Sequence, residues 1–495
     1  MAAIDAQRGL DRAIRFVAAV TLAAALSGCT STVLEGTLGP SQPLVGAAQP
    51  APVDPQVARV GAEEHPRIVA AFGGVYRDPK LEQTLARVVG RLVDASEVPS
   101  QAYRITILNS PTVNAFALPG GYLYVTRGLL ALANDSSELA AVIAHEMAHV
   151  TANHAVERQN RAREAVIVSR VVTDVLDDGL AGKLALASSQ RTLAAFSQQQ
   201  ELEADAIGIR TIGKAGYDPF AAARFLERMG RFADYKSAPG AVQDKRADFL
   251  SSHPSTPQRV EFAIRAARQF GAPGIGEVDR NRYLDGIDGV VFGDDPSQGY
   301  VRGRNFLHPA LGVGFTVPDG FVLDNTADAV LATGTDGTAL RFDGANLAAG
   351  TSLVDYLTSG WVNGLDRSSI TSFSVNGMEA ASARASARGW AFRIILIRAG
   401  ETATYRFIFA NESDAPGLQQ AADATIASFR KLTADEASRL QPLRVRVVTV
   451  RPGDTVERFA AQMSEVDRPA DLFRALNGIG PGDQPSPGSK VKIIQ

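Results

Sequence analysis

Two histidines and a glutamate stand close together in the segment His145-Glu146-Met-Ala-His149. A spacing of four residues is about one helical turn, so both imidazoles would leave the same helix face and reach one metal ion. Zinc held by three protein groups keeps a fourth position for water and lowers the pKa of that water to about 7. Glu146 is placed to accept the proton of that water. The segment therefore indicates hydrolysis of peptide bonds.

A third ligand is needed, and the segment Gln200-Glu201-Leu-Glu203-Ala-Asp205 offers one. Glu201 and Asp205 are four residues apart in a helical context and share a face. We expect Glu201 to bind zinc and Asp205 to accept the free ring N–H of a ligand histidine, His145. Taken alone, two acidic residues at this spacing are usually a solvated helix face. The histidine pair upstream favours the metal, and Glu203 is expected to point elsewhere.

Composition limits the other classes of function. The chain has 495 residues, which at roughly 150 residues per domain allows about three domains. Its formal net charge of −3 gives no indication of a nucleic-acid partner. The single cysteine, Cys29, excludes an intramolecular disulfide framework and a cysteine-rich zinc site. Any metal must therefore be held by histidines and carboxylates.

Residues 1–28 have the pattern of a lipoprotein signal peptide. Arg8, Arg12 and Arg15 lie before or at the start of an apolar run from Ile14 to Leu26. This run is shorter than the roughly 20 residues of a membrane-spanning helix. The stretch that ends at Cys29 reads Leu-Ser-Gly-Cys and resembles the bacterial lipobox, whose cysteine becomes the lipidated first residue of the mature protein. The alternative is a buried amphipathic helix that ends at a chance cysteine.

The resemblance implies a membrane anchor at Cys29. The residue that follows is Thr30 rather than Asp, which by the same resemblance favours the periplasmic face of the outer membrane over retention at the inner one. Residues 29–56 contain five prolines among small and polar residues, a composition that predicts a Pro-rich tether.

The rest of the chain divides into three parts of different texture. Residues 57–272 are mostly helical in pattern, with strand-like alternation at 103–108, 114–118 and 122–126. The spacing Asp135-Ser-Ser-Glu138 is that of a capping box and predicts a helix that begins there and continues to about Glu157. Residues 283–432 carry short β-rich runs with frequent glycine, and residues 445–495 form a last unit. The fold class is therefore α+β.

Several motifs of the first part, taken in order, resemble the M48 family of zinc metallopeptidases, and the resemblance covers residues 57–272. It implies a mainly helical, zincin-like domain with a small sheet, in which His145, His149 and Glu201 bind one zinc ion and Glu146 is the general base. The family commonly has Arg three residues before the ligand Glu, whereas this chain has Gln198. The motifs are Asn114 to Gly121, Gly128 to Leu130, His145 to His149, Glu201 to Asp205, Ala215 to Pro219, and His253-Pro254 with Arg259.

Further histidines receive different interpretations. A His followed by Pro is commonly a turn or a satisfied hydrogen-bonding site, but the family motif implies that His253 lies near zinc. There it would steady the developing oxyanion or occupy the open coordination position in a latent state. Arg259 is expected to fasten that loop. His154 lies nine residues beyond His145, about 180° away around a continuing helix, and is assigned to surface or packing.

The strand predicted at Asn114, Ala115 and Phe116 is a candidate for substrate binding. Zinc peptidases often hold an extended substrate along an exposed strand edge, main chain to main chain. The alternative is an ordinary core strand.

Residues 445–495 have the order strand, helix, helix, strand, which resembles a LysM module. The matching residues are Gly453 to Thr455, Leu476-Asn477 and Pro487-Gly488. The resemblance implies binding of N-acetylglucosamine-containing glycan, here peptidoglycan. The alternative is a packing role on the neighbouring domain.

These features together predict a zinc-dependent endopeptidase of the bacterial cell envelope that hydrolyses unfolded, misfolded or misassembled envelope proteins. Two alternatives remain. One is a non-catalytic chaperone or scaffold lipoprotein that holds peptidoglycan. The other is a hydrolase of peptidoglycan stem peptides, since zinc also cleaves those amide bonds.

Overall fold

The computed structural model describes residues 55–118, 120–154, 198–237, 249, 253, 256–327, 329–387, 389–412 and 416–495. The predicted signal peptide, Cys29 and residues 30–54 of the predicted tether lie outside the described residues. Within those described, no helix combines the length and the apolar character that crossing a membrane requires.

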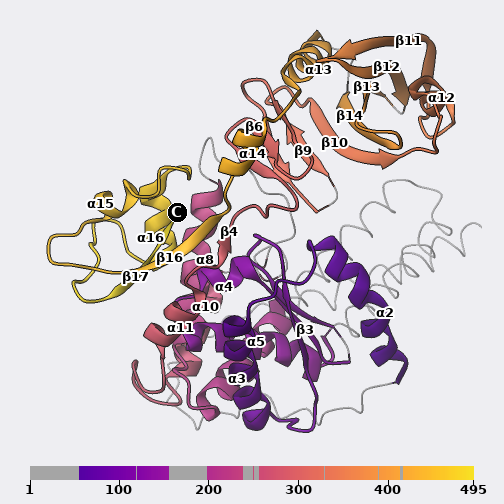
Figure 1. The fold of residues 1–495 in the computed structure, drawn as a ribbon. Coiled ribbons are helices and arrows are strands. Elements are labelled where there is room, and N and C mark those ends of the chain that lie inside the picture. The colour runs from indigo at the N-terminus through magenta and orange to yellow at the C-terminus, as the bar shows by residue number, and fades with distance from the viewer. Residues whose placement is uncertain are drawn as a thin grey trace, which may run out of the picture. The chain divides into compact units, whose positions relative to one another are not determined.

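The first described part is mainly helical and contains a three-stranded sheet (Figure 1). In the sheet order β1-β3-β2, β1 runs parallel to β3 and β2 runs antiparallel to it. The three strands lie where period-2 alternation predicts them. The elements are α2 (Pro55–Ala71), α3 (Pro79–Ala95), β1 (Arg104–Leu108), β2 (Ala115–Leu118), β3 (Tyr122–Thr126), α4 (Arg127–Leu132), α5 (Ser136–Thr151), a helix over residues 198–214, α8 (Ala221–Ser237), α10 (Pro257–Ala267) and α11 (Arg280–Ile287).

The helix α5 begins where the sequence predicts, because Asp135 caps it by accepting a hydrogen bond from the backbone N–H of Glu138 at 2.8 Å. Every side chain from Ser136 to His149 is buried, which explains why the segment is apolar on all its faces. The predicted end near Glu157 is wrong, because the helix ends at Thr151 and Asn153 has a φ of 54°. A left-handed residue at this position ends a helix and turns the chain.

A β-rich part follows, as predicted. It holds a seven-stranded sheet of order β11-β12-β13-β14-β10-β9-β8 and a four-stranded sheet of order β15-β7-β6-β5. Phe306, Phe315, Phe342 and Phe407 are buried in its core. The elements are β4 (Val291–Phe292), β5 (Tyr300–Arg302), β6 (Asn305–His308), β7 (Val313–Thr316), β8 (Val322–Asn325), β9 (Val330–Thr333), β10 (Ala339–Asn346), α12 (Leu353–Thr358), β11 (Leu365–Val375), β12 (Met378–Ala387), β13 (Trp390–Arg398), β14 (Ala403–Asn411), α13 (Pro416–Ser428), β15 (Arg430–Lys431) and α14 (Ala434–Arg439).

The last unit has the strand-helix-helix-strand order that its sequence predicts: β16 (Leu443–Thr449), α15 (Val456–Ala460), α16 (Pro469–Asn477) and β17 (Lys490–Ile494). The strand β16 lies between β17 and β4.

The last unit packs on the first described part. Val445, Phe473 and Ile493 belong to the same buried hydrophobic cluster as Leu92 and Ile143 of α3 and α5. The last unit therefore packs on the neighbouring domain through these residues, which is the alternative to glycan binding given above.

Lys492 adds a polar connection at the same contact. Its side chain is fully buried, and its ammonium group donates to the carbonyl oxygens of Ala131, Leu132 and Ala133 at 2.6–3.0 Å. These are the carbonyl groups at the end of α4, which have no partner inside their helix. The end of the chain thus fastens the segment that leads into α5.

Candidate active site

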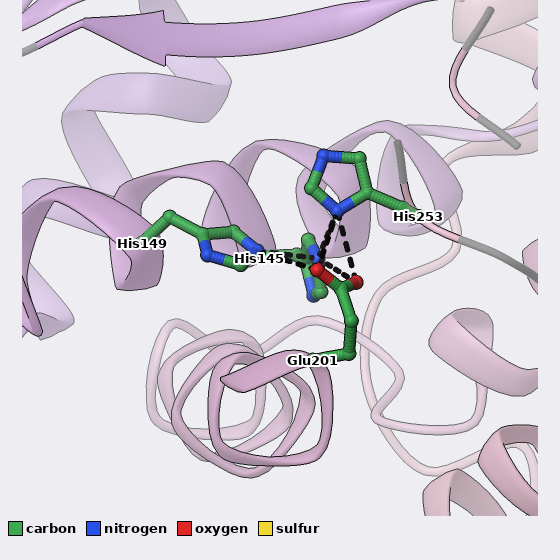
Figure 2. A group of neighbouring side chains, drawn as sticks. All are labelled: His145, His149, Glu201 and His253. Atoms are coloured by element: carbon green, nitrogen blue, oxygen red, sulfur yellow. Dashed lines mark hydrogen bonds and ion pairs between the residues drawn. The ribbon is translucent and has the colours of Figure 1, made fainter. Parts of the chain in front are cut away.

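Four buried side chains converge from distant parts of the chain. His145 and His149 project from α5, Glu201 from the helix over residues 198–214, and His253 from the segment before α10. Figure 2 shows their polar atoms pointing toward one another. All four are at most 8% exposed, so water does not satisfy their charges. Buried polar groups need partners, and these four side chains find them in one another.

The spacing of these atoms fits a tetrahedral metal site. Zinc bonds of 2.0–2.1 Å in a tetrahedron place the ligand atoms about 3.3 Å apart. His145 Nε2 lies 3.1 Å from His149 Nε2 and 3.3 Å from Glu201 Oε2. The other Glu201 oxygen lies 3.5 Å from His149 Nε2. The two imidazoles and the carboxylate are therefore arranged as three ligands of one ion.

His253 takes the fourth corner of this arrangement. Its Nδ1 lies 3.3 Å from His145 Nε2 and 2.9 Å from Glu201 Oε2. Its ring stacks on Phe249 with 4.5 Å between ring centres. Of the two interpretations drawn from the sequence, this position corresponds to the one in which His253 fills the open coordination position.

Glu146 lies beside this corner. Its side chain is 2% exposed, and Oε1 lies 3.5 Å from His253 Nε2. A carboxylate in this place is adjacent to the fourth coordination position, where a general base must lie.

Asp205 holds the first histidine. Its Oδ1 accepts a hydrogen bond from His145 Nδ1 at 2.9 Å, so Nε2 of the same ring is left to face the metal position. Burial lowers the pKa of His145, but the hydrogen bonds to Asp205 and Glu201 outweigh burial and raise that pKa to about 9. The structure thus places Asp205 beside His145, as the sequence predicts.

Arg259 contributes more than the loop contact expected of it. Its guanidinium donates two hydrogen bonds to Asp205, at 2.7 and 2.8 Å. A third contact places Nη1 3.1 Å from Glu201 Oε2. Burial raises the pKa of Asp205, but Arg259 and His145 hold it below its usual value.

The departure at position 198 does not leave Glu201 without a cationic partner. Gln198 is exposed, and Arg259 of α10 pairs with Glu201. Burial raises the pKa of Glu201, yet its hydrogen bonds with His145 and His253 hold that pKa far below its ordinary value. The carboxylate is ionised, as a zinc ligand must be.

His154 is the residue that sequence reasoning misplaced. It is 1% exposed, and its Nδ1 lies 2.9 Å from Nδ1 of His149. The surface alternative and the position about 180° from His145 are wrong, because both assume a helix that continues, whereas the turn at Asn153 returns the chain toward His149. The packing alternative agrees with the burial of the ring. Burial and the neighbouring His145 lower the pKa of His149 well below its usual value.

The strand β2 lies at the edge of its sheet and packs beside α5. Among the residues that the structure describes, β2 pairs with β3 alone. Asn114 precedes β2, and its backbone N–H and C=O both bond to Thr126. Bonded and non-bonded residues alternate along an antiparallel pair, so the backbone groups of Ala115 and Ala117 face away from β3 and those of Phe116 face it. Ala115 is fully buried, and the carbonyl of Val113 accepts a hydrogen bond from the backbone N–H of Phe249 at 2.9 Å, so this edge is covered at its start.

The histidines of the HExxH segment and the carboxylate of Glu201 together form a candidate metal site. Residues 79–267 match the sequence model of Peptidase family M48. This part of the chain is therefore similar to the M48 peptidases.

Three proteins with similar sequences are also named as peptidases. The mitochondrial metalloendopeptidase OMA1 of Schizosaccharomyces pombe is 33% identical over 177 residues, which are 36% of this chain and 50% of that protein. The beta-barrel assembly-enhancing protease of Yersinia pestis is 31% identical over 213 residues, 41% of this chain and 42% of that protein. Its Escherichia coli counterpart is 32% identical over 202 residues, with 39% and 40% covered. The chain thus spans half or less of the length of these relatives.

Proposed function

We propose that this chain is a zinc-dependent endopeptidase of the bacterial cell envelope. The observation that carries the proposal is the convergence of His145, His149 and Glu201 at tetrahedral spacing, with Glu146 beside the fourth position. A zinc ion held there would supply a Lewis acid and a water molecule of lowered pKa.

The residues around the metal position have separate tasks in this proposal. Glu146 accepts the proton of the attacking water and passes it to the leaving amine. Asp205 and Arg259 hold His145 and Glu201 in place through the contacts of 2.7–3.1 Å described above. An extended substrate lies along the part-exposed end of β2, where the backbone of Ala117 faces away from β3.

Metal content tests the ligand set. Purified wild-type protein should contain about one zinc ion per chain, measured by atomic emission after dialysis. Glu201→Ala should lose most of the bound zinc, because it removes one of three ligands and leaves Arg259 without that partner. Glu82→Ala, at an exposed position of α3, is the control and should retain full zinc. Full zinc content in Glu201→Ala would exclude Glu201 as a ligand and direct attention to Glu203 or His253.

The substrates we propose are unfolded, misfolded or misassembled envelope proteins. Two of the relatives are named beta-barrel assembly-enhancing protease, and the lipobox-like sequence at Cys29 supports a lipid anchor on the periplasmic face of the outer membrane. An edge strand that binds main chain rather than particular side chains suits an extended, unfolded substrate.

We also propose that the last unit binds peptidoglycan. Its strand-helix-helix-strand order supports this proposal. Purified protein should co-sediment with isolated sacculi and lose this binding when residues 453–455 are replaced by alanine. Casein should be cleaved, whereas sacculi should release no stem peptides. Release of stem peptides without cleavage of casein would favour the peptidoglycan hydrolase.

A further inference from the structure

The two histidines of the zinc helix have different partners behind them. The ring of His145 donates to the carboxylate of Asp205. The ring of His149 meets another imidazole, that of His154, with 2.9 Å between the two Nδ1 atoms and 4.9 Å between ring centres.

The end of α5 creates the second contact. The helix stops at Thr151, and Asn153 takes the left-handed conformation with a φ of 54°, which asparagine tolerates better than most residues. The following residue is thereby turned back to the face of the helix that carries His149. The backbone carbonyl of His154 accepts a hydrogen bond from Gln200 Nε2 at 3.3 Å, which ties this turn to the helix over residues 198–214.

A metal bound at Nε2 of His149 would fix where the protons of both rings lie. If Nε2 of His149 offers its lone pair to a metal, the proton of that neutral ring is on Nδ1. Nδ1 of His149 then donates, and Nδ1 of His154 must accept. The proton of the second ring is consequently on Nε2, which lies 3.5 Å from Glu203 Oε2.

We propose that His154 is the positioning residue of the ligand His149, acting as a neutral acceptor between His149 and Glu203. In this arrangement, the helix over residues 198–214 supports both ligand rings. Asp205 lies 2.9 Å from His145, and the carboxylate of Glu203 lies 3.5 Å behind His154, which meets His149. Glu203, which the sequence suggests to be a bystander, gains a role. The inference rests on the proposed zinc site and adds to it the means by which the second imidazole is oriented.

Zinc affinity, measured by competition with a chromogenic chelator, tests this role. The matched variants are His154→Asn and His154→Gln, because an Asn amide lies near the Nδ1 position and a Gln amide near the Nε2 position. Loss of an outer-shell partner typically costs about 10- to 100-fold in metal affinity. We expect that loss in His154→Gln, and affinity within about threefold of wild type in His154→Asn.

A second readout follows the protons themselves. Long-range ¹H–¹⁵N spectra of the zinc-loaded wild-type protein should show His149 protonated at Nδ1 and His154 at Nε2. Glu203→Gln should leave the first assignment unchanged and weaken zinc binding less than His154→Gln, since Glu203 is part-exposed and its contact is longer.

The outcomes separate this role from the zinc site itself. Equal zinc affinity in wild type, His154→Asn and His154→Gln would make His154 a packing residue and leave the zinc site intact. A His154 ring protonated at Nδ1 in the zinc-loaded protein would also overturn the proposal. A wild-type protein that binds no zinc would overturn both the role of His154 and the proposed function.

Discussion

Replacing Glu146 by Gln is expected to abolish casein cleavage while leaving zinc in place. Gln has nearly the same shape as Glu, and the site is closely packed around this side chain, which is 2% exposed. The amide cannot accept a proton from water, so the general-base contribution of about 10²- to 10⁴-fold is lost. The loss should fall on kcat, because Glu146 is not among the groups that hold an extended substrate on β2.

Three measurements make this expectation specific. Zinc content and the thermal unfolding temperature of Glu146→Gln should equal those of wild type, which excludes a collapsed site. Glu82→Gln, a change of the same type at an exposed position of α3, should cleave casein at the wild-type rate. Undiminished cleavage by Glu146→Gln would remove the base from the proposed mechanism. A variant that still relieves envelope stress without cleaving casein would favour a chaperone or scaffold.

The parts of the site that the sequence predicts are those set by local periodicity. His145 and His149 share a face because they are four residues apart on one helix, and the same holds for Glu201 and Asp205. The start of α5 is also local, since Asp135 and the backbone of the first turn bond to each other. Such features depend on the few residues around them and are therefore visible in the sequence.

The parts that the sequence misses depend on chain reversal or on distant partners. One left-handed residue, Asn153, decides whether His154 faces solvent or His149, and side-chain periodicity does not report the backbone angle. Arg259 reaches Glu201 and Asp205 from a helix more than fifty residues away. Nothing near Arg259 in the sequence distinguishes this role from that of a loop contact.

Lys492 shows the same limit in the last unit. The alternation Lys490-Val-Lys492-Ile places both lysines on one face of a strand, and such a face ordinarily lies in water. In the structure Lys492 is fully buried, and three carbonyl groups at the end of α4 accept hydrogen bonds from its side-chain nitrogen. The partner lies about 360 residues earlier, so only the tertiary structure shows that this unit supports the segment before the zinc helix.

Replacing His253 by Ala is expected to weaken zinc binding and to raise the rate of casein cleavage. Nδ1 of His253 lies at the fourth corner of the ligand set, 3.3 Å from His145 Nε2 and 2.9 Å from Glu201. A site closed by this ring must open before water and substrate enter. If the closed form is favoured by about 1.4 kcal/mol, one molecule in ten is competent, and removal of the ring raises activity about tenfold.

In the alternative role, the cleavage rate changes in the opposite direction and zinc affinity does not fall. If His253 steadied the oxyanion, its loss would lower kcat by about 10²- to 10³-fold and leave zinc affinity nearly unchanged. If His253 fills the coordination position, zinc affinity falls and cleavage rises. His253→Asn is the matched variant, because its shorter amide occupies much of the same space against Phe249 and protects the packing that the ring provides. Lower cleavage in both variants at unchanged zinc affinity would contradict the latent state and assign His253 to the reaction itself.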